Sequence, residues 1–79
     1  MTLMIDAEPL LALLADVDTA NAGRGRIVAK YRSYEQPTDA QTEQFLKQYQ
    51  EASVTWANAC GALAFAVGVA VDQAKAGSQ

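Results

Sequence analysis

A chain of 79 residues is too short for more than one domain. It also lies near the lower size limit for a domain with its own hydrophobic core, which favours self-association. Hydrophobic residues make up 51% of the chain and exclude a disordered tail, and the net charge of −3 argues against general nucleic-acid binding. With one cysteine and no histidine, the chain has no internal disulfide, and we expect neither a metal nor another cofactor. No basic residue precedes the first apolar residues, so we expect no secretory signal and a cytoplasmic protein.

The first predicted helix spans about residues 7–35. Asp6 is a capping residue, and Pro9 falls in the first turn, where proline is tolerated because the amides there have no acceptor within the helix. Apolar residues then recur at alternating spacings of three and four, the pattern of a helix packed along a seam. Their positions are Leu10, Leu13 or Leu14, Val17, Ala20, Ile27 or Val28, Tyr31 and Tyr34. A turn is predicted at 36–38, because Pro37 disfavours helical geometry in the residue before it.

A stretch rich in glycine and arginine, NAGRGRIVAKYR at residues 21–32, lies inside this predicted helix. The apolar spacing resumes in phase beyond Gly23 and Gly25, which favours one helix, straight or kinked near Gly23, over a loop. The stretch does not have the pattern of a phosphate-binding loop. We therefore interpret the glycines as packing positions that leave room for Tyr49, and we expect Arg24 to lie near Tyr49.

The second predicted helix spans about residues 39–76. It begins with TDAQ, a capping box in which Thr38 and Gln41 satisfy backbone amides. Its seam positions are Phe45, Tyr49, Ala52, Trp56, Ala59 or Cys60, Leu63, Val67 and Ala70. No segment has the pattern of a strand, and the short turn makes the helices antiparallel neighbours. The predicted fold is all-α, a single antiparallel helical hairpin over residues 1–79, with Leu3, Met4 and Ile5 folded back along the end of the second helix.

Residues 52–71, ASVTWANACGALAFAVGVAV, carry no charge. Their length permits a membrane span, but only residues 59–71 are apolar throughout, and polar side chains occupy the first third, so a span is not favoured. A helix that is buried on more than one side explains the run better. We expect a second copy of the chain to cover it, in a four-helix arrangement of two hairpins. The predicted dimer interface consists of Ala62, Phe65, Ala66, Val69 and Ala70.

The chain offers few groups for catalysis, so we expect no enzyme. There is no histidine base, and Cys60 lies among alanines with no nearby base, which indicates a packed thiol. The basic cluster is the best candidate for a binding site, because tyrosine and arginine are common anchors of protein interfaces. The predicted partner-binding residues are Arg24, Arg26, Lys30, Tyr31 and Tyr34. The alternative is solvated charge that pairs in part with Glu43 or Glu51 of the second helix.

Two stretches, AEPLLALLADVDTA and YQEASVTWANACGALAFAVGVAVDQAKA, carry a family resemblance. The proline-leucine-leucine start, the mid-helix tryptophan, the alanine-leucine run and the Gln73-Ala74-Lys75-Ala76 end resemble small phage-encoded quorum-sensing anti-activators. The resemblance covers about half of the chain and leaves out the basic cluster. It implies a dimeric helical hairpin without catalytic activity that binds a host transcription activator at its DNA-binding domain.

Three functional hypotheses follow, and they differ in partner. The leading one is a non-enzymatic phage accessory protein in the host cytoplasm that binds and inhibits a host protein, such as a transcription activator or a defence factor. The second is an oligomeric sponge that captures a small nucleotide signal with Arg24, Arg26, Lys30 and Tyr31. The third is a small membrane-active phage protein.

Overall fold

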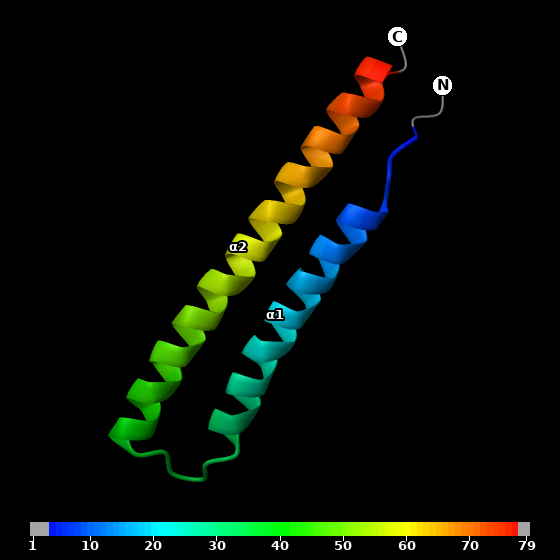
Figure 1. The fold of residues 1–79 in the computed structure, drawn as a ribbon. Helices are drawn as coiled ribbons and strands as arrows, with labels where there is room; N and C mark the ends of the chain where they lie inside the picture. Colours follow the sequence, from blue (N-terminus) through cyan, green and yellow to red (C-terminus); the bar gives the residue numbers. More distant parts are fainter. Residues whose placement is uncertain (1–3, 78–79) are drawn as a thin grey trace.

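A computed structural model describes residues 4–77, and it confirms an all-α helical hairpin. Helix α1 (Glu8–Arg32) and helix α2 (Asp39–Gly77) run antiparallel side by side, and the described ends of the chain lie at the same end of the rod (Figure 1). The rod measures 62 × 16 × 15 Å. Residues 4–77 contain no strand. We call the end with the connecting turn the turn end, and the other the open end.

The first helix ends at Arg32, three residues before the predicted boundary. The hydroxyl of Ser33 contributes to the early end, because it donates to the carbonyl of Lys30 at 2.5 Å and competes for the acceptor that a continuing helix would offer to Tyr34. The amide of Tyr34 donates instead to the carbonyl of Tyr31 at 3.2 Å, a tighter turn. The connection therefore covers residues 33–38, more than the predicted turn at 36–38.

The start of α2 has the predicted capping box. The amide of Gln41 donates to Thr38 Oγ1 at 3.1 Å, and the amide of Thr38 donates to Gln41 Oε1 at 2.9 Å. These two bonds satisfy amides that have no acceptor within the helix, and they fix where α2 begins. At the start of α1, Asp6 Oδ1 accepts the amide of Glu8 at 3.1 Å, although the residue at the cap position itself is Ala7.

Helix α1 continues without a break through the two glycines, but they do not make room for Tyr49. A methyl group added at Gly23 would meet only the guanidinium of Arg26, at 3.7 Å, and one added at Gly25 would meet nothing within 4 Å. Tyr49 reaches α1 through the side chain of Arg24 and not through contact with the glycine backbone. The interpretation of these glycines as packing positions is therefore wrong.

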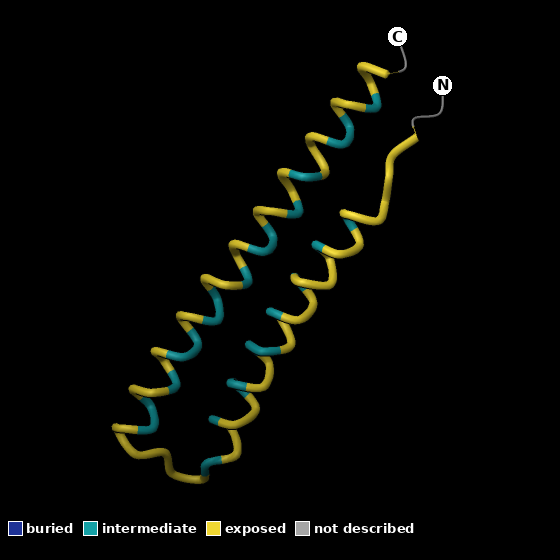
Figure 2. Tube along the Cα trace, in the orientation of Figure 1, coloured by how far each residue is buried: buried dark blue, intermediate teal, exposed yellow. Residues whose placement is uncertain are grey.

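The two helices meet along an inner seam with alternating spacings of three and four, as in a two-stranded coiled coil. On α1 the half-buried seam residues are Leu10, Leu13, Val17, Ala20, Arg24, Ile27 and Tyr31. On α2 they are Thr42, Phe45, Tyr49, Ala52, Trp56, Ala59, Leu63, Ala66 and Ala70. In Figure 2 these half-buried positions follow the sides on which the helices face each other. The predicted seam position Val67 is wrong, since strict alternation from Leu63 reaches Ala66 and leaves Val67 41% exposed.

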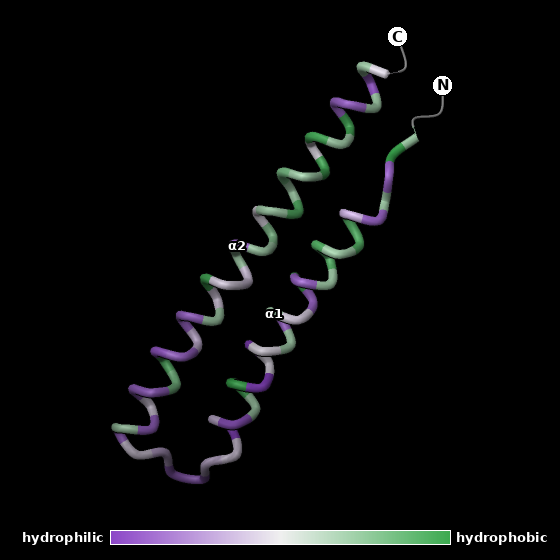
Figure 3. Tube along the Cα trace, viewed as in Figure 1, coloured by the Kyte–Doolittle hydropathy of each residue, from purple (hydrophilic) through white to green (hydrophobic). Residues whose placement is uncertain are grey.

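None of residues 4–77 is fully buried. The chain exposes 6085 Å² of surface, including large apolar side chains such as Phe65 at 75% and Leu11 at 61%. The apolar residues gather toward the open end, while polar ones dominate the turn end (Figure 3). The two helices thus pack along a line and do not enclose a core, so much of their apolar surface stays exposed.

Candidate protein-binding surfaces

Arg24 lies on the inner seam, as the prediction that placed it near Tyr49 requires. Its Nη2 donates to Tyr49 Oη at 3.0 Å, and its guanidinium carbon lies 4.5 Å from the ring centroid of Trp56 and 5.4 Å from that of Tyr49. The electron-rich faces of the two rings stabilise the cation without a carboxylate. Arg24 is therefore occupied in holding α1 on α2, unlike an interface residue that projects into solvent.

The two tyrosines of the predicted partner-binding set are also half-buried. The ring of Tyr31 stacks on Phe45 with centroids 4.3 Å apart, and its Oη shares a hydrogen bond with Thr42 Oγ1 at 2.9 Å. Tyr34 packs edge-to-face on Tyr31 at 6.3 Å. This aromatic cluster closes the turn end of the hairpin, and one face of the Tyr31 ring is already covered.

Arg26 and Lys30 lie four residues apart on one side of α1 and are both exposed, and we call this pair the basic surface. Arg32 is also exposed, but it lies on a different side of α1, where it lines a hollow with Arg24. Within residues 4–77 none of Arg26, Lys30 and Arg32 makes an ion pair, so the expected pairing of the basic cluster with Glu43 or Glu51 is absent. The guanidinium of Arg26 lies over Gly23, one turn back along α1. The two unpaired cations of the basic surface lie on one side of a rigid helix, where a carboxylate-bearing partner can recognise them.

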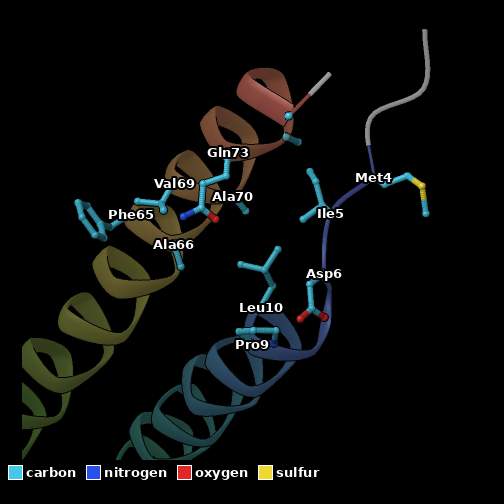
Figure 4. A pocket seen from close by; sticks show the side chains of 12 residues that line it. Met4, Ile5, Asp6, Pro9, Leu10, Phe65, Ala66, Val69, Ala70 and Gln73 are labelled. Carbon is cyan, nitrogen blue, oxygen red and sulfur yellow. The ribbon is translucent and has the colours of Figure 1, made fainter. Parts of the chain in front are cut away.

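An apolar groove of about 800 Å³ opens at the open end, between the segment before α1 and the last turns of α2. Figure 4 shows Ile5 and Leu10 directed toward α2 across this groove, opposite Ala66 and Ala70. Met4 is 88% exposed, so of the residues predicted to fold back on α2, Ile5 lies nearer to it than Met4 does, and Leu3 lies outside the described residues.

The residues of the predicted dimer interface lie on two different sides of α2. Ala66 and Ala70 lie on the inner seam and line the groove beside Leu10. Phe65, Val69 and Ala62 are exposed, and Figure 4 shows Phe65 on the far side of α2 from α1. The exposed members are free to meet another molecule, and their role as a dimer interface stays a prediction.

The sequence also contains an apolar pattern on α2 that the prediction missed, which we call the outer seam. Its members follow the same alternation of three and four as the inner seam, on the opposite side of the helix: Val54, Ala57, Gly61, Ala64, Gly68 and Val71. All but Val71 are exposed. Each mid-helix glycine costs about 1 kcal/mol relative to alanine, and a methyl group at Gly61 or Gly68 would meet nothing within 4 Å. No contact within residues 4–77 explains these two glycines.

A shallow hollow of about 710 Å³ lies on α1 near the turn end, lined by residues that include Asn21, Arg24, Arg32 and Tyr49. The Nε of Arg24 is buried and has no acceptor within the described chain. Two guanidinium groups and an amide beside one hollow are suited to a small anion.

Among residues 4–77 no group of three or more cysteine and carboxylate side chains could hold a metal ion. Cys60 is a half-buried free thiol.

Helix α2 is long and apolar enough to cross a bilayer, a property that it shares with core helices of soluble proteins. However, α1 lies alongside its uncharged half and carries Asp16 and Asp18, both exposed. Inserting the intact hairpin would place these carboxylates in hydrocarbon, which is costly.

Comparison of the chain with protein-family models, with curated proteins and with solved structures finds no match.

Proposed function

We propose that the chain is a non-enzymatic phage accessory protein that binds and inhibits a host protein, such as a transcription activator or a defence factor. The resemblance of its two ends to small quorum-sensing anti-activators supports the phage origin and the inhibitory role. The observation that carries the proposal is the basic surface, because Arg26 and Lys30 share one side of α1 and are exposed and unpaired within the described chain.

This surface suits a protein partner for two reasons. The two cations project from a helix whose inner seam is held on α2 by Arg24 and the aromatic cluster, so their spacing is fixed before binding. A charged surface also accelerates association and selects against wrong partners through like-charge repulsion. The partner's contact surface would carry carboxylates, and occupation of that surface by the hairpin would block what the partner normally binds there.

A pull-down from lysate of a plausible bacterial host tests this function with a matched pair of baits. The wild-type chain recovers a stoichiometric host protein, and the double variant Arg26→Glu/Lys30→Glu loses it while keeping wild-type helicity. A control that reverses charge elsewhere on α1, Asp16→Lys, keeps the partner. Recovery of no stoichiometric protein, or equal recovery by the double variant, would contradict the proposal.

A second candidate function is capture of a small anionic ligand, such as a cyclic or linear dinucleotide. The hollow beside Arg24 and Arg32, with the buried and unpaired Nε of Arg24, is the observation that favours it. Because Phe45 covers one face of Tyr31, base stacking on that ring would be limited to the other face. Ligand capture would raise the melting temperature with dinucleotide concentration, whereas a host-protein inhibitor would show no shift.

A further inference from the structure

We propose that the outer seam of α2 is the contact surface for a second copy of the same chain, packed antiparallel to the first. The proposal starts from the exposed area. A compact folded chain of 8.4 kDa exposes about 4,600 Å². The hairpin exposes 6085 Å², an excess of about 1,500 Å², whereas a standard interface buries about 800 Å² on each partner. The excess is large enough for an obligate dimer.

The outer seam is where a second helix would reduce this excess most. Val54 is 55% exposed and Phe65 beside the seam is 75% exposed, so both have apolar surface to bury. Gly61 and Gly68 lie one heptad apart on the seam, with open space above their backbone. Small residues on one side of a helix let two helix backbones approach closely. A second helix packed on the outer seam would therefore explain the two glycines, which no contact within residues 4–77 of the single hairpin explains.

Charge along the rod favours a second copy and sets its direction. The half of the rod toward the open end, residues 4–20 and 59–77, carries a formal net charge of −4, from Asp6, Glu8, Asp16, Asp18, Asp72 and Lys75. The half toward the turn end, residues 21–58, carries a formal net charge of +1, from Arg24, Arg26, Lys30, Arg32 and Lys47 together with Glu35, Asp39, Glu43 and Glu51. Parallel pairing would bring the two acidic halves together, whereas antiparallel pairing places each acidic half beside the half of the other copy that contains the turn. A two-fold axis near Gly61 places Val54 of one copy opposite Gly68 of the other and so aligns the two apolar seams.

A bilayer is the competing occupant of the same apolar surface. Helix α1 lies alongside the uncharged half of α2 (Figure 1) and carries the exposed Asp16 and Asp18, so the intact hairpin cannot bury that half in lipid without burying carboxylates. A second hairpin needs no such burial, because its contact is confined to the outer side of α2 and leaves α1 in water.

Light scattering on the purified chain with a matched pair of glycine variants tests the proposal, independently of any host partner. The wild type has twice the mass of the 8.4 kDa chain. Gly61→Leu meets nothing within its own hairpin but overpacks the outer seam, and it raises the dimer dissociation constant about 100-fold. Gly25→Leu makes the same change at an equally open site on α1, away from the outer seam, and stays dimeric.

Circular dichroism separates association from folding. Loss of helicity by Gly61→Leu with Gly25→Leu intact also supports the proposal, because no neighbour within the hairpin would explain it. Phe65→Asp provides a second variant that weakens the dimer. A wild type that stays folded and monomeric at high concentration overturns the proposal, as does unchanged dimerisation of Gly61→Leu. A monomer that co-sediments with phosphatidylcholine vesicles would assign the outer seam to lipid and would overturn it too.

Discussion

Arg24 of α1 lies over the indole ring of Trp56 of α2, with 4.5 Å between the guanidinium carbon and the ring centroid. A cation at a seam position of a coiled coil is unfavourable unless it is satisfied, and here Trp56 and the hydroxyl of Tyr49 satisfy it. Apolar residues elsewhere on the seam tolerate a shift along the helix, but this contact exists in one register only. We infer that it fixes how the helices align.

Truncating this side chain should destabilise the hairpin. We expect Arg24→Ala to lower the free energy of unfolding by about 1–2 kcal/mol, mainly because it removes the aliphatic part of the side chain from the inner seam, in addition to the cation–π contact and the bond to Tyr49. Arg24→Met, which keeps the packing volume without the charge, should lie within about 0.5 kcal/mol of the wild type, since apolar replacements of half-buried charges are often neutral. Urea titration followed by circular dichroism at one fixed protein concentration measures both. Equal losses for alanine and methionine would show that charge, and not volume, dominates.

The capping box at the start of α2 should be worth about 1 kcal/mol. Thr38→Ala removes the acceptor for the amide of Gln41, so we expect a loss of about 0.5–2 kcal/mol in unfolding free energy. Thr55→Ala is the matched control, because the hydroxyl of Thr55 only donates to the carbonyl of Glu51 within the helix, at 3.1 Å. Thermal melts of both variants compare them directly. If the two lose the same stability, the cap does not set the start of α2.

Alanine at the α1 glycines should stabilise the protein. A methyl group meets nothing at Gly25 and makes an ordinary contact with Arg26 at Gly23, so Gly25→Ala and Gly23→Ala should each raise the unfolding free energy by about 0.5–1 kcal/mol. Differential scanning calorimetry measures the change. A loss of stability at Gly25 would mean that another molecule approaches α1 there.

The direction of pairing between two copies is open to a crosslinking test. Val54 and Gly68 lie seven residues to either side of Gly61. In a Cys60→Ser background, we expect Val54→Cys mixed with Gly68→Cys to form a disulfide between unlike chains under mild oxidation, because antiparallel pairing brings those positions together. Each variant alone should crosslink slowly. Efficient crosslinking of each variant with itself would instead indicate parallel pairing.

The sequence alone determined the hairpin, because local interactions along the chain specify each helix and the turn between them. The capping box at Thr38 and Gln41 places the start of α2, and the alternation of three and four leaves helices as the only regular structure that buries the apolar residues. The pairing of Arg24 with Tyr49 also followed, since a short turn leaves little freedom in how antiparallel helices align. The exact end of α1 did not, because the hydroxyl of Ser33 competes for the carbonyl of Lys30 before Pro37 has any effect.

The surfaces were decided only by the tertiary structure. Composition and spacing suggested that Arg24, Tyr31 and Tyr34 form one binding cluster with Arg26 and Lys30. Packing leaves the first three half-buried, because α2 supplies aromatic faces and hydroxyls to Arg24 and Tyr31, and Tyr34 packs on Tyr31. The same packing used Ala66 on the inner seam and left Gly61 and Gly68 facing outward. Helical periodicity says which residues share a side, and only the position of the second helix says which side remains for another molecule.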